Sequence, residues 1–169
     1  MQTSTHLEFS TLSDAIQECF KDSPHAFAFL ADIFTISATW DDLIDRDTYV
    51  TDAAIHTMME LTLSLPLNPF YIQHFPTLHT LLHNAIRNWK AANLIERDSE
   101  ATEDALLQAF VLRSSYIDLV AACAALVHDN ATAERVSYAV RLLNSKEGFT
   151  RYKASLIKEQ EARNGRRMR

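Results

Sequence analysis

The segment from Ser23 to Asp47, SPHAFAFLADIFTISATWDDLIDRD, decides the fold that the sequence predicts. Ser23 is a suitable N-cap and Pro24 suits the first helical position, so a helix is predicted to begin here. From Ala26 to Trp40 the only charged residue is Asp32, and four aspartates then follow within seven positions. These aspartates are Asp41, Asp42, Asp45 and Asp47. The clustered aspartates at the end of such a helix either form a metal or phosphate site or mark the point where the helix extends from the core into solvent.

The spacing of this helix predicts that its inward face becomes acidic. Residues three and four apart share a face, which lines up Phe27, Leu30, Phe34, Ala38, Asp41 and Asp45. Asp42 points about 100° away from Asp41, as adjacent helical residues do. A helix that runs out into water usually changes face as well as polarity. This one is predicted to keep its inward face.

Composition predicts an all-α fold in one domain over residues 1–169. The chain is 47% hydrophobic, enough for a real core, and has only two glycines and four prolines to break helices. We expect a single bundle of six or seven helices, with residues 1–10 and 164–169 disordered. The expected helices cover 11–21, 24–47, 51–65, 76–96, 100–128, 130–147 and the chain from 150. Residues 66–76 are expected to form an irregular, aromatic-rich loop.

Charge and targeting features predict a soluble, cytoplasmic protein. The formal charge of −6 disfavours nucleic acid as a partner. Residues 1–10 do not resemble a signal peptide, and the apolar run Ala26 to Trp40 is shorter than the ~20 residues of a membrane span. Cys19 and Cys123 lie in apolar helix faces and are expected to be free thiols.

Two groups of cationic residues call for acidic partners. Arg113 lies within the apolar stripe of the 100–128 helix, where a buried arginine needs a carboxylate or phosphate beside it. The C-terminal segment either touches an acidic partner or nucleic acid, or is a solvated end. Its basic residues are Arg151, Lys153, Lys158, Arg163, Arg166, Arg167 and Arg169.

The sequence Asp41-Asp42-x-x-Asp45, at the end of an inward-facing apolar helix, resembles the aspartate-rich motif of class I terpenoid (isoprenoid) synthases. The resemblance implies an all-α bundle, here a reduced one, in which Asp41 and Asp45 bind Mg²⁺ and Asp42 supports them. It also implies that Arg113 binds the substrate diphosphate. The family's second metal motif has its nearest match at Asn144-Ser145. Gly148 and Tyr152 stand where that motif has serine and glutamate.

A second set of residues resembles the ligand order of hemerythrin-like di-iron bundles. Imidazole and carboxylate groups one turn apart on facing helices can hold two irons. The set is His25, His56, Glu60, His79 and His83. It lacks the final His-x-x-x-x-Asp of that family, and the alternative is that these are ordinary surface residues.

Three functions therefore remain open, and no catalytic residue is assigned. The first is a small terpenoid-synthase-like protein that binds Mg²⁺ and a diphosphate; if active, it would be a prenyl-diphosphate lyase or transferase. The second is a non-enzymatic interaction or assembly protein with a structural Asp/Arg network, acting on a protein partner or as a homo-oligomer. The third is an incomplete hemerythrin-like metal bundle.

Overall fold

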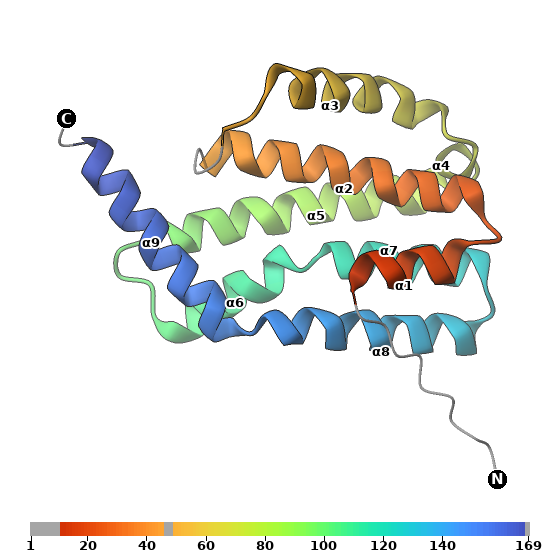
Figure 1. Cartoon of the computed structure of the whole chain (residues 1–169). Coiled ribbons are helices and arrows are strands. Elements are labelled where there is room, and N and C mark those ends of the chain that lie inside the picture. The colour runs from red at the N-terminus through yellow and green to blue at the C-terminus, as the bar shows by residue number, and fades with distance from the viewer. Residues whose placement is uncertain (1–10, 46–48, 168–169) are drawn as a thin grey trace, which may run out of the picture.

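The structure is a computed structural model that describes residues 11–45 and 49–167, with the backbone alone at 45, 144–147 and 159–167. The described residues form helices and no strands, which confirms the all-α prediction (Figure 1). The elements are α1 (Leu12–Phe20), α2 (Pro24–Asp45), α3 (Asp52–Ser64), the 3-10 helix η1 (Leu65–Leu67), α4 (Pro69–Gln73), α5 (Phe75–Glu96), α6 (Glu103–Arg113), α7 (Tyr116–Val127), α8 (Asn130–Glu147) and α9 (Phe149–Arg167).

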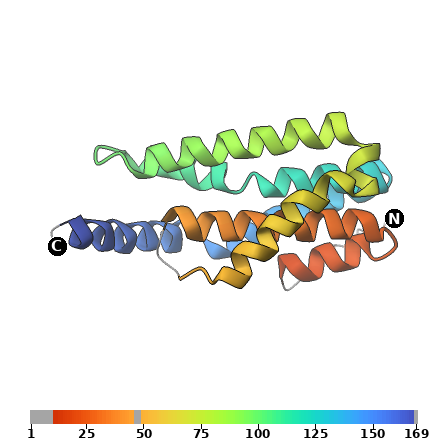
Figure 2. The ribbon, with the colours of Figure 1, turned by 90° about the horizontal axis from the view of Figure 1, so that it is seen from above.

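The longer helices pack side by side around one core. α5 packs against α6 and α7, and α7 packs against α8, while α1 bridges α2, α7 and α8. α3 covers α2 and crosses it obliquely, as the view from above shows (Figure 2). α9 leaves α8 at a steep angle and packs against α6 and α8 (Figure 1).

The inward face of α2 differs in part from the predicted one, although Leu30 is buried and Phe34 packs against the core as expected. Ala26, Phe29 and Leu30 are buried against α1, α4 and α7, whereas Phe27 is 39% exposed. Ala38, also expected to face inward, is exposed. The physical reason is that α2 is apolar nearly all round, so helical periodicity does not fix which side faces the core.

Two local features raise the number of helices above the six or seven predicted. The expected loop contains η1 and α4, and Asn68 caps α4 by accepting hydrogen bonds from the N–H groups of Phe70 and Tyr71. The aromatic side chains of Phe70 and Tyr71 are buried, so this segment is part of the core. The predicted 100–128 helix begins later, at Glu103, and is divided into α6 and α7.

Serine side chains explain the division between α6 and α7. The Ser114 hydroxyl donates to the carbonyl of Phe110, and the Ser115 hydroxyl donates to the carbonyl of Leu112 at 2.6 Å. Serine hydroxyls offer the backbone alternative partners and so weaken a helix interior. The break directly follows Arg113, which is the last residue of α6.

One apolar segment and the C-terminal helix differ from what the sequence predicted. Within the described ranges, Glu103–Val127 is long and apolar enough to cross a membrane by length and composition, and its 18-residue window has a mean hydropathy of 1.7. The sequence predicted no apolar stretch long enough for a membrane span, whereas this segment does reach that length. Core helices of globular proteins meet the same criterion, and a third of the window is buried in the fold. α9 continues to Arg167, past the predicted disorder at 164, because its sequence is rich in good helix formers. Residues 1–10 lie outside the described ranges.

Candidate functional site

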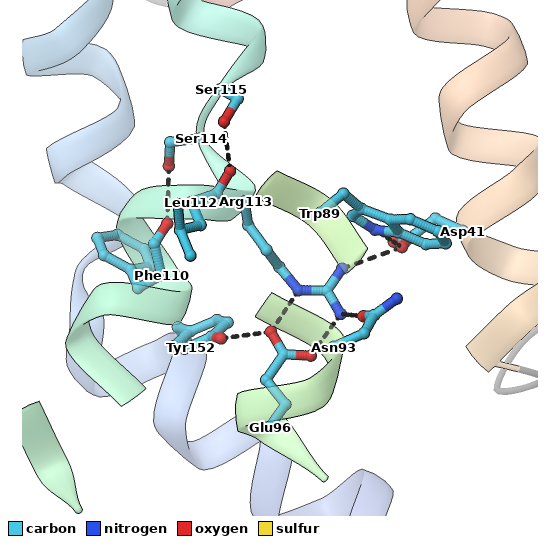
Figure 3. A network of polar contacts seen from close by, with 10 residues as sticks. All are labelled: Asp41, Trp89, Asn93, Glu96, Phe110, Leu112, Arg113, Ser114, Ser115 and Tyr152. Carbon is cyan, nitrogen blue, oxygen red and sulfur yellow. Dashed lines mark hydrogen bonds and ion pairs between the residues drawn. The ribbon is translucent and has the colours of Figure 1, made fainter. Parts of the chain in front are cut away.

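The guanidinium of Arg113 is the centre of a polar network that joins the four helices α2, α5, α6 and α9 (Figure 3). Its Nε donates to Oε1 of Glu96 at 2.5 Å, and its Nη2 donates to Oε2 of Glu96 at 2.6 Å. This two-point pairing matches the fork of the guanidinium to both carboxylate oxygens. Nη2 also donates to Oδ1 of Asn93 at 2.8 Å. Arg113 comes from α6, whereas Glu96 and Asn93 come from the last turn of α5.

Asp41, near the end of α2, joins the network from the opposite side. Its Oδ1 accepts from Nη1 of Arg113 at 3.0 Å and from the indole Nε1 of Trp89, also at 3.0 Å. Trp89 lies on α5, two turns before Glu96, so the same α5 face supplies the acceptor for Arg113 and a donor for Asp41. The network therefore fixes the end of α2 to α5 and α6.

Tyr152 connects α9 to the same group of residues. Its hydroxyl donates to Oε1 of Glu96 at 2.5 Å, and its ring lies 5.3 Å from that of Phe110. Burial, followed by the hydrogen bond to Glu96, raises the pKa of the Tyr152 phenol above its ordinary value. The phenol is thus held neutral, as a donor to a carboxylate.

Burial separates the network into an inner and an outer part. The side chains of Glu96 and Arg113 are 5% and 19% exposed, whereas that of Asp41 is 45% exposed. Coulombic attraction is strong where water is excluded and weak at the surface. The Arg113–Glu96 pair is therefore the energetic centre, and Asp41 is a solvent-facing addition.

The structure brings together only part of the predicted Mg²⁺–diphosphate site. Asp41 and Arg113 are directly paired, so the arginine contacts protein carboxylates. Asp42 is partly buried and forms no ion pair with any residue that the structure describes. The side chain of Asp45 lies outside the described part, as do those of Asn144 and Ser145. Among the described side chains, no three His, Cys, Asp or Glu gather to hold a metal ion.

The histidine set is spread over the surface of three helices. His25, His56, Glu60, His79 and His83 are all exposed. His79 stacks on the ring of Phe75 and contacts His83, and its Nδ1 lies 3.0 Å from the hydroxyl of Tyr71. These contacts tie α4 to α5, and they give the di-iron interpretation no support.

Sequence reasoning missed four members of the network: Trp89, Asn93, Glu96 and Tyr152. A signal existed for the first three, because Asn93 and Glu96 continue the inward line of Trp89 at helical spacing. A buried carboxylate on α5 was therefore available to pair with Arg113. Tyr152 had no such signal, because the direction of α9 depends on how that helix packs.

No protein family model, curated protein or solved structure matches this chain. The resemblances to terpenoid synthases and to hemerythrin-like bundles therefore remain expectations from sequence motifs.

Proposed function

We propose that this chain is a non-enzymatic helical assembly protein that pairs with a second copy of itself through the outer side of α3. The Asp41–Arg113–Glu96 network then serves to hold the helices of each copy in place. The observation that carries the proposal is a stripe of exposed apolar side chains on α3 and η1, here called the outer apolar face. Its members, Met59, Leu63 and Leu67, are 55%, 76% and 74% exposed.

The outer apolar face is largely uncovered by the described residues. α3 packs against α2 and η1 and buries only Met58 of its own residues. Met59 and Leu63 are four residues apart and so lie on one line, and Leu67 follows in η1. Helices that are apolar on more than one side are normally buried on more than one side. An exposed apolar stripe of this kind is typical of an interaction surface.

Low charge around the face favours a second copy as the partner. From Tyr49 to Ile86 the chain has two acidic residues, Asp52 and Glu60, no lysine or arginine, and four histidines, which the formal charge counts as neutral. The centres of protein interfaces are similarly depleted in charge. Two copies related by a two-fold axis would bring the same three apolar residues against each other with few like charges between them.

The hydrogen bonds of Arg113 support a structural role for the network. Nε, Nη1 and Nη2 of the guanidinium all donate to side chains of the same chain. An arginine that binds a diphosphate would need donors directed at that ligand. The bonds that Arg113 makes instead join α2, α5 and α6.

Light scattering after size-exclusion chromatography tests the assembly. We expect a dimer for the unaltered protein and a monomer for Leu63→Glu, because a carboxylate would then be buried in the interface. The matched control is Leu94→Glu on α5, where the leucine is 72% exposed and lies outside the outer apolar face. This variant should remain a dimer.

Circular dichroism should show that both variants keep their helices. A monomeric unaltered protein up to the highest soluble concentration would refute the proposal. Equal dissociation by Leu63→Glu and Leu94→Glu would also refute it.

A second candidate is the Mg²⁺–diphosphate function. It is favoured because Asp41 still has a carboxylate oxygen that could bind a metal ion. Asp41 uses only Oδ1 toward described residues, and its side chain is 45% exposed. Melting with Mg²⁺ plus pyrophosphate or a prenyl diphosphate analogue tests this candidate, since a ligand that binds only the native state raises its stability. The stabilisation should be lost in Asp41→Asn/Asp45→Asn. No shift at millimolar ligand would reject it.

A further inference from the structure

We propose that a pocket between α6, α7 and α9 binds a small organic anion with one flat apolar ring and one carboxylate or phosphate group. This site is separate from the outer apolar face and does not depend on dimer formation. Its argument rests on the size of the pocket, on the rings that line it and on two polar groups of α9.

The size of the pocket fits a single ring with a charged substituent. The cavity measures about 260 Å³ and opens to solvent. A dry apolar cavity of about 150 Å³ is enough to hold benzene. The space here therefore accommodates one aromatic ring together with a charged group.

Aromatic side chains form the apolar part of the pocket. Phe110 of α6, Tyr116 of α7 and Tyr152 of α9 all line it. The rings of Phe110 and Tyr152 contact each other at 5.3 Å, and Tyr116 is held edge-on against Phe34 of α2 at 5.8 Å. These contacts fix the rings before a ligand arrives, and rigid aromatic surfaces bind flat apolar groups at low entropic cost.

Arg151 and Ser155 provide the polar end of the pocket. They are four residues apart on α9 and so lie on the same side of that helix, and both line the cavity. Arg151 is exposed and forms no ion pair within the described ranges. Lys153, by contrast, is paired with Glu103 at 2.6 Å. A guanidinium with available donors and a nearby hydroxyl suits a carboxylate or phosphate group.

The side of the pocket formed by Arg113 and Tyr152 limits how much negative charge a ligand can carry. Arg113 lines this side, but its positive charge faces the two carboxylates of Glu96 and Asp41. The Tyr152 hydroxyl is also committed to Glu96. Recognition of an anion therefore falls to Arg151 and Ser155, which favours one small anionic group over a diphosphate. A cationic ligand would meet Arg151 and be repelled.

Titration calorimetry with four probes tests this inference. The probes are benzoate, phenyl phosphate, benzamidine and inorganic phosphate. We expect saturable millimolar binding of benzoate, phenyl phosphate or both, and the stronger of the two identifies the preferred head group. Benzamidine, which has the same ring and a positive charge, should not bind. Inorganic phosphate should bind at least about tenfold more weakly than phenyl phosphate because it lacks the ring.

Variants of α9 locate the binding. Arg151→Gln should weaken binding of the anion by about tenfold or more, and Ser155→Ala by a few-fold. The matched control is Lys158→Gln, which removes a charge from an exposed residue of the same helix that does not line the pocket. Its affinity should stay within about twofold of the unaltered protein. Equal weakening by Arg151→Gln and Lys158→Gln, equal binding of benzamidine, or no saturation by about 10 mM of either aromatic anion would overturn the proposal.

Discussion

Replacing Arg113 by methionine should destabilise the fold far more than any change to Asp41. The substitution keeps most of the apolar stem but leaves Glu96, only 5% exposed, as a buried carboxylate without its counter-charge. Removing one partner of a buried ion pair costs about 3–5 kcal/mol. Asp41 is 45% exposed, so losing its contact with Arg113 through Asp41→Asn should cost about 1 kcal/mol or less.

Urea denaturation followed by circular dichroism measures both free energies of unfolding. In a domain of this size each kcal/mol lowers the melting temperature by roughly 2–4 °C, so Arg113→Met should lower it by roughly 6–20 °C. The double variant Arg113→Met/Glu96→Leu should recover more than half of the lost stability, because neither charge is then left buried alone.

Three results would refute this reasoning. The first is a loss below about 1 kcal/mol for Arg113→Met, which is the range of exposed ion pairs. The second is a gain in stability for Arg113→Met, as expected for an arginine kept unpaired for a ligand at a cost to the free protein. The third is an equal loss of stability for Arg113→Met and Asp41→Asn, which would show that the inner and outer parts of the network contribute equally.

Three further predictions follow from single residues. Gly148 has a φ of 69° between α8 and α9, so Gly148→Ala should destabilise the protein by about 1–3 kcal/mol in the same urea assay. Burial raises the pKa of Cys123 to about 12, so its thiol should react with a thiol reagent at pH 8 only as fast as the protein unfolds, whereas half-buried Cys19 should react sooner. The raised pKa of Tyr152 stabilises the fold below pH ~10 and this contribution falls above it, because the unfolded chain loses the proton first. Tyr152→Phe should flatten that alkaline decline in the urea midpoint; an unchanged slope would contradict the assignment.

The sequence predicted the helices well wherever capping or helix-breaking residues mark their ends. Ser23, Thr51 and Asp129 each directly precede an observed helix, and Thr51 and Asp129 accept capping hydrogen bonds from the N–H groups of Ala54 and Thr132. The α6–α7 break was not predicted, because two serines inside an apolar helix are individually tolerated. The buried face of α2 was also wrong in part, since packing against α1, α4 and α7 selects it.

Only part of the candidate site could be predicted from the sequence, because packing also decides which residues meet there. A buried arginine demands an acidic partner, and the sequence identified Arg113 and predicted a salt bridge to one of the aspartates at the end of α2, which the structure shows to be Asp41. It did not identify Glu96, which is the closer and more buried partner. A charge rule states that a partner must exist, but only the packing of α5 against α6 decides which carboxylate it is.

The residues that meet at Arg113 lie at very different separations along the chain, which bears on the order of folding. Glu96 is 17 residues from Arg113, whereas Asp41 is 72 residues away, and Tyr152 is 56 residues from Glu96. Closing the short connection costs less chain entropy than closing the long ones. The α5–α6 hairpin with its ion pair should therefore form early, and α2 and α9 should dock onto it later. In kinetic measurements, changes at Arg113 and Glu96 should slow folding, whereas changes at Asp41 and Tyr152 should mainly speed unfolding.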